Sequence, residues 1–294
     1  MICDILFKPQ IIYNKKDIFY IKYISFYQHI CKRGYKEAAA KVFNKKSSHT
    51  STWIQRQISD RYVLRAKNDN YRSRAAYKLI ELDNKYLFLK KNKIILDIGC
   101  YPGSWCQVIL ERTKNYRNKI IGIDKNIMDP LPNVYFIQGE IGVDNIDNKN
   151  NINNKKNINY IDNINKNSVD YKLREILQDK KIDVILSDAA VPCIGNKIDD
   201  HLNSCELTLS ITHFMEQYIN IGGIYILKMY LGSQTNNLKT YLKGIFQYVH
   251  TNKPKASRKE SREIYLVCRN FIGRKKITED IQIKGSFSSK EGYY

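Results

Sequence analysis

Closely spaced cysteines are missing from this sequence. The seven cysteines are odd in number, and none of them form a Cys-x-x-Cys pair. Disulfide frameworks need pairable cysteines and structural zinc sites need clustered ligands, so neither is indicated. The five histidines show no ligand spacing either, and we expect no metal site. This cysteine usage fits a reducing compartment, in which most thiols act as small core residues.

Long apolar runs are also absent. The best of them, Ile221 to Leu227, contains two glycines and ends at Lys228. A transmembrane helix needs roughly 18 or more consecutive apolar residues. We therefore expect no membrane span.

Acidic residues are few for the number of basic ones. The chain has 49 Lys and Arg residues against 29 Asp and Glu residues, a formal net charge of +20. Such a balance favours a polyanionic partner such as nucleic acid, because neutralised phosphates release their counterions. A genome biased toward Lys, Asn, Ile and Tyr codons would also produce this charge. Charge alone therefore does not identify a function.

The first 52 residues form a basic extension that we separate from the rest of the chain. Many lysines lie in the first fifty residues, against only three acidic residues, Asp4, Asp17 and Glu37. A basic, acid-poor and partly amphipathic leader is typical of an organelle transit peptide. The alternative is a disordered or RNA-contacting extension.

From Ile94 onward, short apolar segments alternate with helical segments. This alternation predicts an α/β fold with a mostly parallel sheet covered on both faces. We expect helices over 105–111 and 202–218, and strands over 94–98, 120–124, 134–138, 184–188, 222–228, 246–250 and 263–268.

An Asn-rich segment at about 143–168 interrupts this pattern. Its apolar content is limited to isolated isoleucines, so it buries too little surface to offset its ordering entropy. We expect a disordered insertion in a surface loop. The main domain is then predicted to cover 53–272, with a flexible tail over 273–294.

A glycine-containing turn follows the first predicted strand of the α/β region. It reads Asp97-Ile-Gly-Cys-Tyr-Pro-Gly-Ser-Trp105, at the strand end where open α/β sheets bind ligands. Gly99 and Gly103 let the backbone turn sharply and approach a ligand closely. The spacing differs from Gly-x-Gly-x-x-Gly, and no Walker lysine follows. Asp124 ends the next strand and could hold ribose hydroxyls. The motif favours S-adenosylmethionine, with a nucleotide-binding Rossmann domain as the alternative.

This turn resembles the Asp-Leu-Gly-Ala-Ala-Pro-Gly-Gly/Ser-Trp signature of the FtsJ/RrmJ family of rRNA 2′-O-methyltransferases. Upstream, Arg72-Ser-Arg-Ala-Ala-Tyr-Lys-Leu79 resembles the family's Arg-Ser-Arg-Ala-x-x-Lys-Leu. Segments between Trp53 and Lys67 resemble the mitochondrial large-subunit rRNA branch. Further motifs follow in the family's order, at 127–130, 187–188, 227–232 and 257–263. The resemblance implies a Rossmann-like methyltransferase fold with a mixed, mostly parallel seven-stranded sheet.

The resemblance also implies a catalytic tetrad. Lys228 would be the central lysine, acting as the base or orienting the 2′-hydroxyl. Lys78 would orient the ribose or its phosphate, and Glu263 would fix one lysine by a charge-assisted hydrogen bond. Considered individually, three of these residues could be ordinary surface or strand-end charges, and the fourth a helix-capping or turn residue. The tetrad comprises Lys78, Asp188, Lys228 and Glu263.

The resemblance further implies a cofactor site and an RNA-gripping pair. Arg72 and Arg74 are expected on the same short helix as Lys78, and they would hold the RNA backbone. Glu140, where the family usually has Asp, would face the adenine. Tyr101 replaces a small residue of the family's turn, and Asp188 is followed by Ala-Ala-Val-Pro in place of the family's Met-Ala-Pro-Asn. The implied residues for S-adenosyl-L-methionine are Asp97, Gly99, Gly103, Trp105, Asp124, Glu140 and Asp188.

The function that these motifs imply is 2′-O-methylation of a ribose, with uridine the expected base, in large-subunit rRNA. We expect a monomer that acts on this rRNA or on a pre-ribosomal particle, in the mitochondrion. A plastid-like organelle or the cytoplasm and nucleus are the alternative locations. The alternative functions are a catalytically weak or inactive rRNA-binding assembly factor, or a tRNA or cap 2′-O-methyltransferase.

Overall fold

The computed structural model describes residues 59–114, 116–141 and 168–274. From Arg61 onward these residues belong to one compact unit of the chain. The predicted N-terminal extension lies outside the described residues, as do the predicted Asn-rich insertion, except for Ser168, and the tail beyond Arg274.

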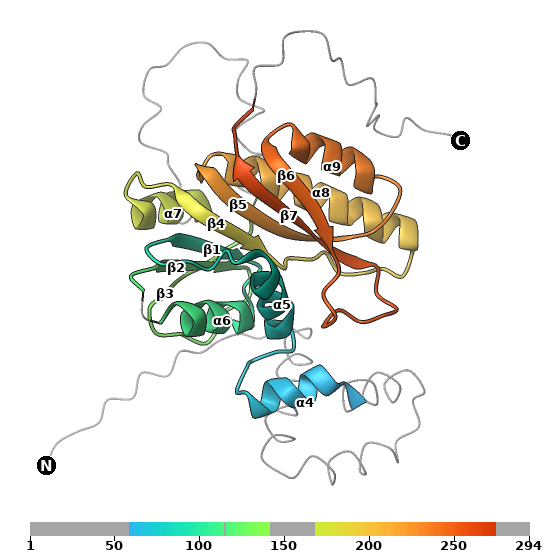
Figure 1. Cartoon of the computed structure of the whole chain (residues 1–294), viewed down its shortest axis with the longest axis horizontal. Helices are drawn as coiled ribbons and strands as arrows, with labels where there is room; N and C mark the ends of the chain where they lie inside the picture. The colour runs from blue at the N-terminus through green and yellow to red at the C-terminus, as the bar shows by residue number, and fades with distance from the viewer. Residues whose placement is uncertain (1–58, 115, 142–167, 275–294) are drawn as a thin grey trace, which may run out of the picture. The chain divides into compact units, whose positions relative to one another are not determined.

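The described residues form a seven-stranded sheet in the order β3-β2-β1-β4-β5-β7-β6 (Figure 1). Strands β1 to β5 run parallel to one another, whereas β7 runs antiparallel to both of its neighbours, β5 and β6. The prediction of a mixed, mostly parallel seven-stranded sheet is confirmed. The strands are β1 (Ile94–Ile98), β2 (Lys119–Asp124), β3 (Val134–Gln138), β4 (Ile182–Ser187), β5 (Ile219–Tyr230), β6 (Phe246–Asn252) and β7 (Glu263–Phe271).

Helices cover both faces of the sheet, because alternate residues of each buried strand point to opposite faces. Side chains such as Ile95 and Ile226 pack with α5 and α6 in one core. Their strand neighbours Leu96 and Leu227 pack with α7, α8 and α9 in the other. The helices are α4 (Arg61–Asn68), α5 (Ala76–Tyr86), α6 (Ser104–Thr113), α7 (Val169–Leu177), α8 (Lys197–Glu216) and α9 (Thr235–Lys243).

Helix α8 begins five residues before the predicted start at 202. The side chain of Asn196 caps it by accepting a hydrogen bond from the Ile198 amide at 3.0 Å. Asp199 and Asp200 then occupy the first turn, where negative charge is favourable. Because the first turn of α8 is polar, the apolar periodicity of the sequence did not predict its first five residues. Among the described residues, no helix has the length and apolar content needed to cross a bilayer.

Candidate active site

The register of β5 and β7 gathers four polar side chains on one face of the sheet. Lys228 lies opposite Tyr265, and Tyr230 lies opposite Glu263. Directly opposed residues of an antiparallel pair share a face, as do residues two positions apart on one strand. The four side chains therefore lie on the face covered by α5, at the carboxyl ends of the parallel strands.

Asp188 directly follows β4 and joins this group beside Lys228. Its carboxylate Oδ1 lies 2.9 Å from Lys228 Nζ and accepts a hydrogen bond from the Tyr265 hydroxyl at 2.7 Å. Lys228 Nζ also donates to the backbone carbonyl of Asp188. Both charged side chains are largely buried. The end of β4 thus holds the ammonium of Lys228 in a defined position.

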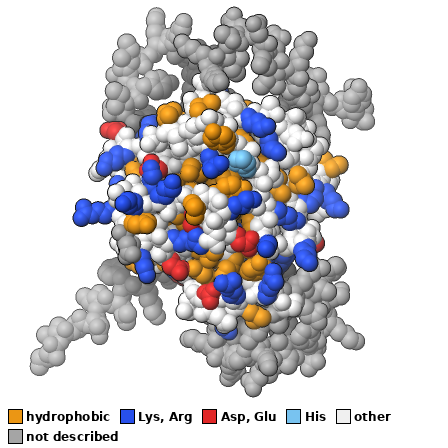
Figure 2. Space-filling view, viewed as in Figure 1, with side chains coloured by type: hydrophobic (Ala, Val, Ile, Leu, Met, Phe, Trp, Pro, Cys, Tyr) orange, Lys and Arg blue, Asp and Glu red, His pale blue; other side chains and the backbone are white. Residues whose placement is uncertain are grey.

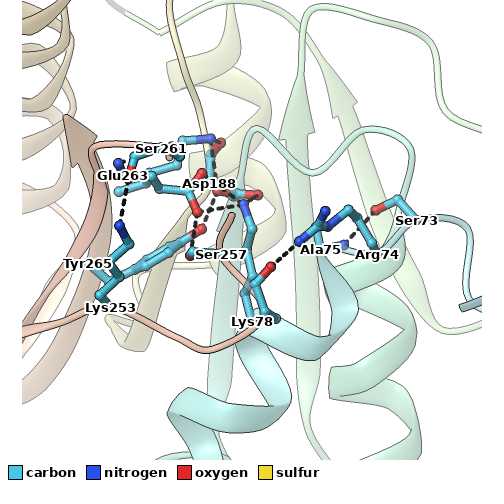
Figure 3. Close-up of polar contacts among 12 residues, drawn as sticks. Ser73, Arg74, Ala75, Lys78, Asp188, Lys253, Ser257, Ser261, Glu263 and Tyr265 are labelled. Atoms are coloured by element: carbon cyan, nitrogen blue, oxygen red, sulfur yellow. Dashed lines mark hydrogen bonds and ion pairs between the residues drawn. The ribbon is translucent and has the colours of Figure 1, made fainter. Parts of the chain in front are cut away.

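Lys78, on α5, completes the group, and its side chain points toward Asp188 and Glu263 (Figure 3). Its Nζ lies 2.9 Å from each carboxylate oxygen of Glu263 and 3.9 Å from Asp188 Oδ2. The Ser257 hydroxyl donates to Glu263 Oε1 at 2.7 Å. The four residues named from the sequence motifs therefore form one connected cluster, in which two lysines alternate with two carboxylates.

The charge of Asp188 is fixed by its lysine partners. Burial by itself would raise the pKa of this carboxyl. The charges of Lys228 and Lys78, together with hydrogen bonds from Lys228 and Tyr265, outweigh that effect and lower the pKa below its ordinary value. Asp188 therefore remains a carboxylate that holds both ammonium groups close to the same point.

Tyr265 was not among the residues predicted for the site. It is fully buried, donates to Asp188, and lies with its ring centroid 5.8 Å from Lys78 Nζ. Burial, followed by the charges of Asp188 and Glu263, raises its pKa well above the usual range, so its hydroxyl remains a donor. The strand pattern could have revealed it, because Tyr265 follows Glu263 by two positions on a predicted strand.

The turn after β1 has the backbone geometry predicted for its glycines. Gly99 has φ +75° and Gly103 has φ +108°, values that L side chains rarely adopt. A Cβ built on Gly99 would lie 2.7 Å from the Ala189 Cα, next to Asp188. The turn therefore packs backbone to backbone against the segment that carries Asp188, and a side chain at this glycine would push the two apart.

Asp97, at the end of β1, is buried with one carboxylate oxygen lacking a hydrogen-bond partner. The other oxygen accepts from the Cys106 thiol at 3.2 Å. Burial is the main cause that raises the pKa of Asp97 to about 7, and the nearby Asp188 and Asp124 charges add to it. An unsatisfied buried acceptor beside a glycine turn is a position that suits a donor from a bound cofactor.

The other residues predicted to bind cofactor have varied surroundings. Asp124, at the end of β2, accepts from the Tyr101 amide at 2.9 Å and from the Asn126 amide at 2.8 Å. Glu140 is exposed beyond β3, 3.8 Å from Lys125 Nζ. The Trp105 indole is buried and donates to the Ala75 carbonyl at 2.8 Å, so it packs α6 against the start of α5.

Arg72 grips the chain's own backbone at the cofactor turn. Its Nη1 donates to the carbonyls of Pro102 at 2.9 Å and Asp129 at 2.8 Å, and its Nη2 donates to that of Pro130 at 3.2 Å. A Cβ on Gly103 would lie 2.7 Å from Arg72 Nη1. This guanidinium thus links the loop after β1 to the loop after β2. Its role in RNA binding stays a prediction.

Arg72 and Arg74 were expected on the same short helix as Lys78, and this was wrong. Helix α5 begins at Ala76, and both arginines lie in the turn before it. Outside the helix, Arg74 Nη2 donates a hydrogen bond to the Ala256 carbonyl, and Arg74 Cζ lies 5.6 Å from the Tyr62 ring centroid. This turn therefore connects the start of α5 to the segment before β7.

Replacing Arg72 with lysine should weaken S-adenosylmethionine binding by roughly tenfold. A single ammonium lacks the planar fork that reaches both loops, and each lost hydrogen bond costs about 1 kcal/mol. Calorimetric titration of the cofactor measures the effect, with Arg74→Lys as the matched control that leaves both loops untouched. If Arg72→Lys weakened RNA binding but left cofactor affinity unchanged, the loop-positioning role would be wrong.

His201, on α8, holds the loop that follows Lys228. Its Nδ1 lies 2.7 Å from the Tyr230 carbonyl, and its Nε2 accepts from the Gln234 amide at 2.9 Å. These partners assign the proton to Nδ1 of a neutral imidazole. A Cβ on Gly232 would lie 2.3 Å from the ring. The loop is therefore seated directly on this histidine, which does not reach the carboxylate–lysine cluster.

Comparison with known families assigns the chain. Residues 71–271 match the family of FtsJ-like methyltransferases, a range that includes the cofactor turn and all four clustered residues. The chain belongs to the FtsJ-like methyltransferase family. S-adenosylmethionine is accordingly its cofactor, in agreement with the unsatisfied Asp97 oxygen and the glycine turn.

Individual relatives of this FtsJ-like methyltransferase cover most of its length. The protein named ribosomal RNA large subunit methyltransferase E from Parvibaculum lavamentivorans is 35% identical over 243 residues, covering 80% of this chain and 86% of its own. The protein of the same name from Ehrlichia chaffeensis is 38% identical over 237 residues, covering 79% and 97%. A Plasmodium falciparum crystal structure provisionally described as a ribosomal RNA methyltransferase is 81% identical, with a TM-score of 0.59, covering 69% of this chain and 100% of its own.

Proposed function

We propose that this FtsJ-like methyltransferase transfers a methyl group to a ribose 2′-hydroxyl of large-subunit rRNA, with uridine as the acceptor nucleoside. The observation that carries the proposal is the cluster of two lysines and two carboxylates beside the cofactor turn. It lies at the carboxyl edge of the parallel strands, where α/β sheets bind their ligands. Relatives named for large-subunit rRNA methylation supply the substrate class.

The cluster provides what methyl transfer to a hydroxyl requires. When bound, S-adenosylmethionine supplies an electrophilic methyl group on a sulfonium. A hydroxyl is a weak nucleophile near neutral pH, so it must be positioned and its proton must be accepted. The ammonium that Asp188 holds must first lose a proton; as an amine, Lys228 Nζ then orients the acceptor oxygen and takes its proton. Asp188, 2.9 Å away, stabilises the resulting ammonium.

Lys78 and Glu263 have a supporting role in this proposal. Lys78 reaches toward the same point as Lys228, because both ammonium groups lie within 4 Å of the Asp188 carboxylate. Glu263 holds Lys78 with both of its oxygens and is itself fixed by Ser257. We assign Lys78 to the ribose or its phosphate, and Glu263 to the orientation of Lys78.

The surface of the domain suits an RNA substrate. Figure 2 shows Lys and Arg side chains spread over the face viewed, with fewer Asp and Glu side chains among them. A net charge of +20 for the chain favours association with phosphates through counterion release.

The mitochondrion is the proposed location. It is supported by the basic first 52 residues and by residues 53–67, which resemble the mitochondrial branch of the family. A fluorescent reporter fused to residues 1–52 tests that location directly.

Incubation of the purified protein with radiolabelled S-adenosylmethionine and large-subunit rRNA tests the proposed reaction. Label should appear in the rRNA on the ribose of one uridine. Alkaline hydrolysis would show this, because a 2′-O-methylated ribose leaves a labelled, alkali-resistant dinucleotide. Cofactor binding without methyl transfer would contradict the proposed reaction and indicate an rRNA-binding assembly factor. Preferential transfer to tRNA or capped RNA would instead assign a different substrate to the same chemistry.

A further inference from the structure

A basic hollow lies at the amino ends of the parallel strands, opposite the carboxyl ends that hold the carboxylate–lysine cluster. It has a volume of about 520 Å³. Its lining comes from the residues at or just before the starts of β1, β2, β4 and β5, which the parallel topology brings to one edge. The lining residues are Asn92, Lys93, Ile94, Arg117, Lys119, Lys180, Lys181, Asp183 and Asn220.

The charge of this hollow is strongly positive. Five cationic side chains and one carboxylate line it, which leaves a net charge of +4. The carboxylate, Asp183, accepts from Lys93 Nζ at 3.0 Å and from the Ile94 amide at 3.0 Å. Its charge is therefore already compensated within the wall. The four remaining cations repel one another. An anion bound in the hollow would be attracted to each of them and would offset this repulsion.

Two of the lysines are held in place by helix ends. Lys119 Nζ donates to the Ile176 carbonyl in the last turn of α7 at 2.8 Å. Lys181 Nζ donates to the Gln217 carbonyl at the end of α8 at 2.7 Å. An ammonium has three donors, so each retains hydrogen-bonding capacity for another acceptor. Asn92 and Asn220 add amide donors, so the wall combines fixed charge with neutral donors, which suits phosphate oxygens.

The hollow is too far from the cluster to serve the reacting nucleotide. Asp183 of the hollow lies on β4, and Asp188 of the cluster directly follows this strand, five positions further along. A strand rises about 3.3 Å per residue, which gives a separation of roughly 17 Å. One nucleotide cannot bridge that distance, whereas a folded RNA of several helical turns can.

We propose that this hollow binds phosphate groups of the rRNA backbone remote from the methylated ribose. The proposal rests on the proposed rRNA substrate and extends it with a second contact site. Phosphate contacts fix the position of an RNA without reading its sequence. The hollow therefore contributes to affinity and orientation for a large RNA and leaves the chemical step unchanged.

The test compares two double variants on RNA substrates of two lengths. Arg117→Ala/Lys180→Ala removes two exposed cations of the hollow, and Lys239→Ala/Lys243→Ala removes two cations of α9 as the matched control. With a long rRNA fragment, the hollow variant should raise KM and Kd at least about threefold with kcat unchanged. The slope of log K against log salt should fall in magnitude by about 1.5, because each phosphate contact contributes 0.7 to 0.9. A short oligonucleotide around the target should bind both variants like the wild type.

Several results would overturn the proposal. One is an equal effect of the hollow variant on long and short RNA, or of the two double variants on the long RNA. Another is inorganic phosphate that binds the wild type but not the hollow variant, while the affinity for long RNA stays the same. That result would assign the hollow to free phosphate. Because RNA affinity is measured without turnover, failure of methyl transfer by the wild type would contradict the proposed reaction and not this site.

Discussion

Lys228→Ala is expected to reduce methyl transfer to rRNA by roughly 100- to 10,000-fold, the range that a positioned proton acceptor contributes. The variant loses the amine that contacts the acceptor hydroxyl in the proposed reaction. Affinity for S-adenosylmethionine should stay within a few-fold, because the turn after β1 and Asp97 do not contact this side chain. Single-turnover transfer and calorimetric cofactor titration measure the two quantities separately.

Lys253→Ala provides the matched control for Lys228→Ala. Lys253 Nζ also donates to backbone carbonyls near the cluster, those of Lys259 at 3.2 Å and Ser261 at 2.6 Å, but it contacts neither Asp188 nor Glu263 (Figure 3). Transfer by this control should remain within a few-fold of the wild type. Retained turnover in Lys228→Ala would remove this lysine from the mechanism. Equal losses in both variants would indicate a structural effect.

Part of the site could be predicted from the strand pattern. Asp188 and Lys228 follow or end apolar strands, and carboxyl ends of parallel strands meet at one edge of a sheet. The observed pairing confirms their proximity, since Ser187 lies opposite Leu227 in the parallel register. Resemblance was needed for Lys78 and Glu263, because 185 positions separate them and only the packing of α5 on β7 brings them together.

Other contacts were beyond the sequence because they depend on tertiary structure. Arg72 lies in a basic motif that favours RNA binding, yet it also binds carbonyls up to 58 positions away. Helix α7 begins directly after the Asn-rich segment, with Ser168 as its cap accepting from the Tyr171 amide. A short helix beside a low-complexity segment has too weak an apolar pattern to be distinguished from it. The basic hollow likewise collects residues from the starts of four strands that are far apart in the sequence.

The second large effect concerns Asp97 and the stability of the cofactor-free protein. The pKa of this carboxyl is raised to about 7, mainly by burial, from a value near 3.8 in the unfolded chain. Between these two values the folded state binds a proton that the unfolded state has lost. The free energy of unfolding should therefore fall as pH rises from about 4 to about 7, and this contribution should be constant above pH 7. At about 1.4 kcal/mol per pKa unit, the loss amounts to at most about 4 kcal/mol.

Asp97→Asn removes this titration while nearly preserving the shape of the side chain. Urea unfolding of the variant without cofactor should show a weaker decrease in stability between pH 5 and pH 8 than the wild type. Cofactor affinity should fall by at least about tenfold, because an amide nitrogen can replace the buried acceptor oxygen that lacks a protein partner.

Identical pH profiles for the two proteins would show that Asp97 is ionised throughout. Unchanged cofactor affinity would remove it from the cofactor site. A variant that is more stable at pH 8 but binds cofactor less tightly would show that the buried carboxylate is retained for binding at the expense of folding stability.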